Sequence, residues 1–194
     1  VYFNFFVFSM LLLVMSSNFL VMFFGWELVG LSSYLLISFW SKKPAAAKAG
    51  NKAFVINRVG DFGFLIGLMI ILDTFNTFDF YKILQNTNGV AESTITSISL
   101  FLLLGAFGKS AQFPLFSWLP DAMEGPTPAS ALIHAATMVT AGVFMLVRIS
   151  PILQQSKIAS LVIIVFGLIT ALLAAFSAIN LSLIHISEPT RRKR

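Results

Sequence analysis

Five ionisable residues lie inside apolar stretches of the sequence, where a charge is costly. They are Glu27, Arg58, Asp61, Lys109 and His134. A charged side chain at the centre of a bilayer costs about 3 kcal/mol on insertion scales, so such residues usually face the interior of a helix bundle or a water-filled path. Carboxylates, lysine and histidine can each gain and lose a proton, and their presence here indicates proton or ion transport.

Lys109 and Glu27 are the two charges that need an explanation most. Lys109 lies in the run LLLGAFGKSAQFPLF, residues 102–116, about ten residues from the nearer end of its predicted segment. A buried lysine can release its proton near neutral pH, and a nearby carboxylate restores it, as a proton relay requires. Glu27 lies near the midpoint of another apolar segment, between Gly25 and Gly30, which allow a second helix to come close.

Arg58 and Asp61 are three residues apart, so they share a helical face and can pair with each other. A self-neutralised structural pair and a role in transport both explain these two charges. Their position only two turns into the segment also allows snorkelling toward the membrane surface.

His134 follows EGPTPASALIH, in which Pro126 and Pro128 mark the start of a helix. Its spacing predicts a polar stripe with Thr137 and Thr140. Alone, a histidine on an apolar face is more often a hydrogen-bonded core residue. Its combination with Glu27 and Lys109 favours a proton relay instead.

The elements that position these residues are transmembrane helices. The chain has 194 residues, of which 57% are hydrophobic and 11% charged, and its mean hydropathy is +0.87. Apolar runs of about 20 residues recur, long enough to cross a bilayer as helices, whereas the short alternating segments of a barrel are absent from the sequence. We therefore predict an all-α, polytopic transmembrane helix bundle with about six spans: 2–17, 18–40, 52–72, 95–119, 128–149 and 158–180.

Two connections and the charge distribution refine this picture. The tripeptide SSN at 16–18 predicts a tight turn between antiparallel first and second helices. If every segment spans, one side of the membrane holds four lysines, at 42, 43, 48 and 52, against three basic residues on the other, which weakly favours the first side as the inner one. The chain begins at Val1 within an apolar run, so we expect it to belong to a longer protein.

Several other functions are disfavoured by the composition. Cysteine is absent and only two histidines are present, which argues against a metal site. GAFGKS carries part of a phosphate-binding loop motif, but the spacing is wrong and the setting is a membrane. Four of the basic residues occupy the last four positions, 191–194, so the net charge of +5 does not indicate nucleic-acid binding.

Three sequence runs resemble one family. GKSAQFPLFSWLPDAMEGPTPASALIHAATMVTAGV (108–143), GWELVGLSSYLLISFW (25–40) and AFVINRVGDFGFLIG (53–67) are similar to the NADH dehydrogenase subunit 5 family, the distal antiporter-like membrane subunit of respiratory complex I. The resemblance covers about residues 1–180. Sister subunits 2 and 4 differ in these runs, and the large subunit of multisubunit sodium/proton antiporters shares much of the motif but fits less well.

The resemblance implies an antiporter-like fold and specific roles. It implies that Glu27 pairs with Lys109, that His134 belongs to a central hydrophilic axis, and that Arg58 and Asp61 are coupling charges. It further implies that the chain binds no cofactor or metal, because NADH, FMN, Fe–S clusters and ubiquinone act in other subunits. The expected partners are other membrane-arm subunits, especially antiporter-like subunit 4, and membrane lipids, with no nucleic acid.

We therefore expect residues 1–180 to form a partial antiporter-like transmembrane domain. Residues 181–194, including His185, resemble nothing in the family, and we expect this tail to be non-native or disordered and without function. The primary hypothesis is a proton-translocating subunit of complex I, a translocase component with no redox chemistry of its own. The expected location is the mitochondrial inner membrane, or alternatively a bacterial plasma membrane. A sodium/proton antiporter subunit and a chain that only packs against its neighbours are the other hypotheses.

Overall fold

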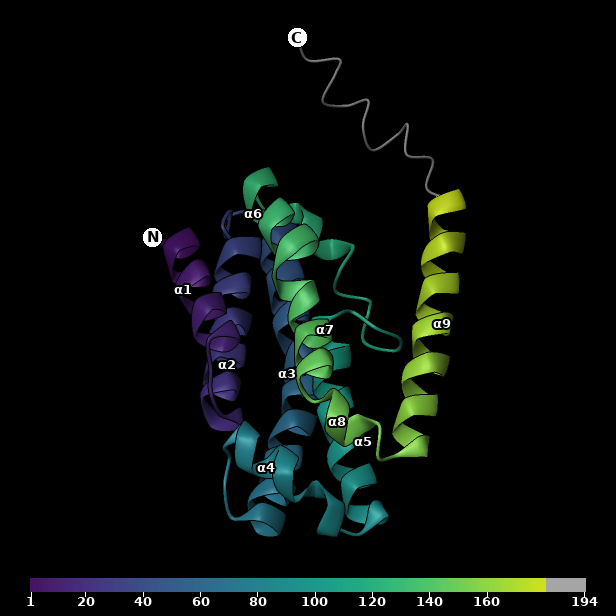
Figure 1. The fold of residues 1–194 in the computed structure, drawn as a ribbon. Helices are drawn as coiled ribbons and strands as arrows, with labels where there is room; N and C mark the ends of the chain where they lie inside the picture. The colour runs from purple at the N-terminus through teal and green to yellow at the C-terminus, as the bar shows by residue number, and fades with distance from the viewer. Residues whose placement is uncertain (181–194) are drawn as a thin grey trace.

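The computed structural model describes residues 1–180, and all the regular elements in this part of the chain are helical (Figure 1). In chain order they are α1 (Tyr2–Val14), α2 (Phe19–Ile37), α3 (Pro44–Phe75), α4 (Phe80–Asn86), η1 (Thr87–Gly89), α5 (Glu92–Lys109), η2 (Asp121–Glu124), α6 (Thr127–Ala131), η3 (Leu132–Ala136), α7 (Met138–Arg148), α8 (Ser150–Leu153) and α9 (Lys157–Asn180). The predicted all-α class is confirmed. The predicted tail, 181–194, lies outside the described residues.

Four helical segments of the described chain are long and apolar enough to cross a membrane: Phe19–Ile37, Pro44–Phe75, Thr127–Arg148 and Lys157–Ala178. The first predicted span is also an apolar helix, α1, but it has only 13 residues. The predicted helix starts at Pro126 and Pro128 agree with α6, which has proline at its first turn.

The span predicted for residues 95–119 is wrong at its C-terminal end. Helix α5 ends at Lys109, and the chain then passes through turns, with Ala111 in the left-handed region at φ 49°. Pro114 and Pro120 follow, and neither can donate the backbone hydrogen bond that a continuing helix needs. Lys109 is therefore the last residue of a helix and not a residue in the middle of one.

The predicted hairpin of the first two helices is present. Asn18 caps the start of helix α2: its side chain accepts a hydrogen bond of 2.8 Å from the Val21 N–H, one of the unpaired donors of the first turn. Gly25 packs against the backbone of α1, since a Cβ at this position would lie 2.6 Å from the Leu13 nitrogen. The small residue therefore permits the close approach that the sequence predicted for α2.

Helices α3 and α5 form the centre of the bundle. They touch at two glycines, because a Cβ on Gly60 would lie 3.0 Å from the Gly108 Cα. The residues that follow these glycines in sequence, Asp61 and Lys109, are consequently brought together across the two helices. Helix α9 stands to one side of the bundle (Figure 1) and reaches it through the Phe166 ring, stacked on Phe107 at 5.3 Å.

Candidate functional site

Two ion pairs link the charged residues in the middle of the bundle. Lys109 Nζ lies 3.5 Å from Asp61 Oδ2, and these side chains are 0% and 4% exposed. Arg58 forms the second pair with Glu27. The Arg58 side chain is 44% exposed and the Glu27 side chain 20%, so the first pair is buried and the second lies at the edge of the bundle.

The structure corrects the pairing expected from the sequence. The family resemblance implies a pair of Glu27 with Lys109, and the spacing of Arg58 and Asp61 allows these two to pair, but each carboxylate instead meets the other cation. The helical positions give the reason. Arg58 and Asp61 are offset around α3, so Asp61 turns inward to α5 while Arg58 turns outward, where it also lies 4.7 Å from the Phe54 ring centroid.

Trp26 is the residue of α2 that enters the buried pair. Its Nε1–H donates a hydrogen bond of 2.8 Å to Asp61 Oδ1, and the indole is fully buried. The next residue along the helix, Glu27, is rotated by about 100° and reaches the partly exposed edge. Neighbouring residues of α2 thus serve different ion pairs.

The Lys109 ammonium rests against α2 at Gly30. A Cβ on Gly30 would lie 2.6 Å from Lys109 Nζ, so the ammonium occupies space that any other residue at this position would fill. The ammonium also lies 6.0 Å from the centre of the Trp26 ring. Its position as the last residue of α5 adds a favourable interaction with the partial negative charge of a helix C-terminus.

No described side chain or carbonyl hydrogen-bonds to Lys109 Nζ. The distance of 3.5 Å to Asp61 allows an electrostatic attraction but is too long for a charge-assisted hydrogen bond. The ammonium is therefore held by charge and shape, and its N–H groups remain free to donate to water.

His134 lies in the next part of the site, connected to Lys109 through Trp118. The imidazole stacks on the Trp118 indole, with centroids 6.3 Å apart and planes 28° apart. The Trp118 Nε1–H donates in turn to the carbonyl of Gly108, at 3.1 Å, which is the residue before Lys109. Both His134 ring nitrogens are buried, and neither makes a hydrogen bond of good geometry within the described part of the chain.

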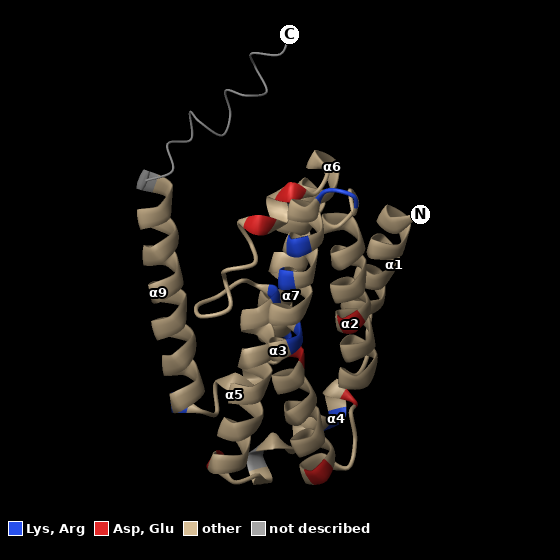
Figure 2. Cartoon of the chain, turned by 180° about the vertical axis from the view of Figure 1, so that it is seen from behind, with Lys and Arg blue, Asp and Glu red and all other residues tan. Residues whose placement is uncertain are grey.

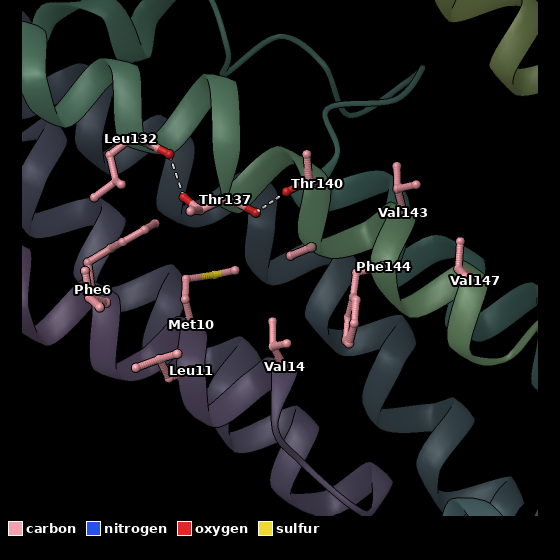
Figure 3. Close-up of a pocket in the computed structure, with 12 residues that line it drawn as sticks. Phe6, Met10, Leu11, Val14, Leu132, Thr137, Thr140, Val143, Phe144 and Val147 are labelled. Atoms are coloured by element: carbon pink, nitrogen blue, oxygen red, sulfur yellow. Dashed lines mark hydrogen bonds between the residues drawn. The ribbon is translucent and has the colours of Figure 1, made fainter.

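The helix that carries His134 is interrupted by a π-turn, η3, the kind of local irregularity that recurs at functional sites. The Thr137 hydroxyl donates to the Leu132 carbonyl at 2.5 Å, and the Thr140 hydroxyl donates to the Thr137 carbonyl at 2.9 Å (Figure 3). These threonines line an apolar groove of about 590 Å³ between α1 and α7. His134 does not line this groove, so the predicted three-residue polar stripe is divided by the π-turn.

The sequence alone missed several residues of this site. Trp26 was overlooked because tryptophan in an apolar run is indistinguishable from a packing residue until its N–H partner is known. Trp118 was overlooked for the same reason. Gly60 and Gly108 were visible as small residues, but only the packing of α3 on α5 shows that they bring the two charges together.

The distribution of charge supports one class of protein. Figure 2 shows Lys, Arg, Asp and Glu at the ends of the bundle and in its middle, whereas α1 carries no charged residue and α9 only Lys157 at its start. Apolar helices surround a few interior charges, two of which form a buried ion pair. The fold and the site thus define a polytopic helical membrane protein with ionisable residues in its interior.

Comparison with known proteins gives the family. Residues 16–184 match the family described as NADH:quinone oxidoreductase/Mrp antiporter, transmembrane region, and the chain belongs to this family. It is 56% identical over 187 residues to NADH-quinone oxidoreductase subunit L of Neisseria meningitidis, covering 90% of this chain and 28% of that protein. It is also 56% identical over 174 residues to NADH-ubiquinone oxidoreductase chain 5 of Rhizopus stolonifer, covering 90% of this chain and 27% of that protein.

A solved structure shares the fold. The Mrp complex of Dietzia sp. DQ12-45-1b contains a chain that matches with a TM-score of 0.85 and 32% identity, over 90% of this chain and 19% of that one. The chain described here spans little more than a quarter of the length of the curated relatives it matches.

Proposed function

We propose that this chain is part of a proton-translocating membrane subunit of respiratory complex I, in which electron transfer from NADH to ubiquinone in other subunits drives proton movement. The observation that carries the proposal is the buried ion pair of Lys109 and Asp61. A fully buried lysine without a hydrogen bond is costly to maintain and is suited to repeated proton exchange. The subunit L and chain 5 relatives, each 56% identical, support the assignment to complex I.

The proposed relay uses Lys109 as the central proton carrier. Asp61 stabilises the charged form of Lys109, whereas burial stabilises the neutral form. A small change in the local electric field therefore moves the proton. The Glu27–Arg58 pair is positioned to supply such a change, because Arg58 and Asp61 lie on the same helix. His134, whose ring nitrogens make no hydrogen bond of good geometry within the described part of the chain, receives the proton through water on the far side of Trp118.

The remaining features of the proposal concern the assembly. The chain is a component of a translocase and performs no redox chemistry; it binds no cofactor or metal, and NADH, FMN, Fe–S clusters and ubiquinone act in other subunits. Its partners are other membrane-arm subunits, with antiporter-like subunit 4 as the neighbour, together with lipid and no nucleic acid. The membrane is the mitochondrial inner membrane, with a bacterial plasma membrane as the alternative. Residues 1–180 constitute its transmembrane domain.

The test is Lys109→Ala in the complete subunit within the assembled complex. Proton translocation per NADH oxidised is measured with a pH-sensitive dye in sealed vesicles. We expect pumping to fall while assembly, followed on native gels, is retained. Pumping at the wild-type ratio would refute the proposal.

A second candidate function is that of a subunit of a sodium/proton antiporter, favoured by the structural match to the Mrp complex. It uses the same interior charges but requires no electron transfer. Proton movement that depends on NADH and stops with a complex I inhibitor supports the first function. Proton movement driven by a sodium gradient, without NADH, supports the second.

A further inference from the structure

The buried carboxylate of Asp61 is held by two different groups. Its Oδ1 accepts the hydrogen bond of 2.8 Å from Trp26 Nε1, whereas its Oδ2 faces Lys109 Nζ at 3.5 Å. The indole contact has the geometry of a good hydrogen bond and the ammonium contact does not. The position of the carboxylate is therefore set by the tryptophan and not by the lysine.

The indole itself is fixed by aromatic packing. The Trp26 ring meets the Phe64 ring edge-to-face, with centroids 5.2 Å apart and planes 86° apart. Phe23, one turn earlier on α2, meets the same Phe64 ring at 5.4 Å and 86°. Both Trp26 and Phe64 are 0% exposed, so neither ring can turn without displacing core residues.

We propose that Trp26 is a positioning residue that holds the Asp61 carboxylate beside Lys109 while Lys109 gains and loses its proton. This inference rests on the proposed relay function of Lys109. The indole N–H is a directional donor, so it fixes the orientation of the carboxylate that faces the ammonium. With Trp26 in place, Asp61 keeps its position in both states of Lys109, so the ammonium returns to the same site in each cycle.

The charged groups near Asp61 are few. Lys109 faces it from α5, Glu27 lies on α2 next to Trp26, and Arg58 is on the same helix as Asp61 but is engaged by Glu27. Among the described residues, Trp26 is the one whose side chain donates a hydrogen bond to the Asp61 carboxylate.

The experiment is Trp26→Phe in the complete subunit of the assembled complex, with proton translocation per NADH oxidised and assembly on native gels as the readouts. A hydrogen bond to a charged group changes an equilibrium by about tenfold or more. We therefore expect the rate of proton translocation to fall by about tenfold while assembly is retained. Trp40→Phe, at an exposed tryptophan beyond the end of α2, is the matched control and should leave proton translocation unchanged.

A second variant separates the lost donor from lost packing. Benzothienylalanine, inserted at position 26 by codon suppression, keeps the bicyclic shape and replaces the N–H with sulfur, so it should reproduce the loss of proton translocation even if Trp26→Phe does not assemble. Combining Trp26→Phe with Asp61→Asn should give no further loss than Asp61→Asn alone. Wild-type proton translocation with benzothienylalanine, or additive losses in the double variant, would overturn the inference. The relay function of Lys109 is tested separately, by Lys109→Ala.

Discussion

Gly30→Ala tests the position of the Lys109 ammonium without removing any charge. The new Cβ would lie 2.6 Å from Lys109 Nζ, and ordinary contact begins at 3.4 Å, so the ammonium must move by about 1 Å. Movement away from Asp61 lengthens the ion pair from 3.5 Å to about 4.5 Å, which weakens it by about 1 kcal/mol at an effective dielectric constant of about 20. This corresponds to an ion pair that is weaker by about sixfold.

The substitution is suited to the purpose because it does not disturb the helix. Alanine is a better helix former than glycine by about 1 kcal/mol, so α2 itself is not weakened. The atom that the Cβ meets is the flexible end of a side chain, and the backbone of α5 can remain in place. Unfolding is therefore not the expected cause of any loss of function.

The assay is proton translocation per NADH oxidised, measured in vesicles that carry the assembled complex. We expect reduced pumping with normal assembly. Gly167→Ala in α9 is the control, since a Cβ there has nothing within 4 Å. If Gly30→Ala pumps with the wild-type ratio, the ammonium does not rest against Gly30 and the proposed site geometry is wrong.

Three further substitutions test the packing. Gly60→Ala places a Cβ 3.0 Å from the Gly108 Cα, so the backbone of one helix must shift. We expect the free energy of unfolding to fall by about 1–3 kcal/mol, measured as a lower thermal transition temperature. An unchanged transition temperature would contradict the close contact of α3 and α5. Asn18→Ala removes the cap of α2 and should cost about 1 kcal/mol, measured in the same way. Lys52→Ala breaks the pair with Asp121, whose side chains are 43% and 46% exposed, and should change stability by less than about 1 kcal/mol; a large loss would show a buried role for this pair.

Most of the fold could be predicted from the sequence, because the length and apolarity of each segment are local properties. The helix around Glu27 was predicted correctly in this way, as was the turn before Asn18. The helix around Asp61 was also predicted, but α3 begins at Pro44, eight residues before the predicted start at residue 52. The end of α5 at Lys109 was not, since the apolar run continues past it. The apolarity of a segment does not depend on its backbone angles, so it cannot predict the left-handed residue Ala111 that follows the end of the helix.

The candidate site was predictable in its members and not in its connections. Glu27, Arg58, Asp61, Lys109 and His134 stand out in the sequence because charged and titratable residues are costly in a membrane. Which carboxylate meets which cation depends on the rotation of α2, α3 and α5 about their axes and on how closely they approach. Neither quantity is encoded in any single segment.

The sequence by itself determined that this is a helical membrane protein with charges in its interior, because both conclusions follow from the transfer cost of side chains between water and lipid. Only the tertiary structure decided that Lys109 pairs with Asp61, that Trp26 holds the carboxylate and that Gly30 accommodates the ammonium. The physical reason is range. The free energy of transferring a side chain from water to lipid depends on the type of that residue and can be read along the sequence. Hydrogen bonds and close contacts act over a few ångströms, between atoms that only packing brings together.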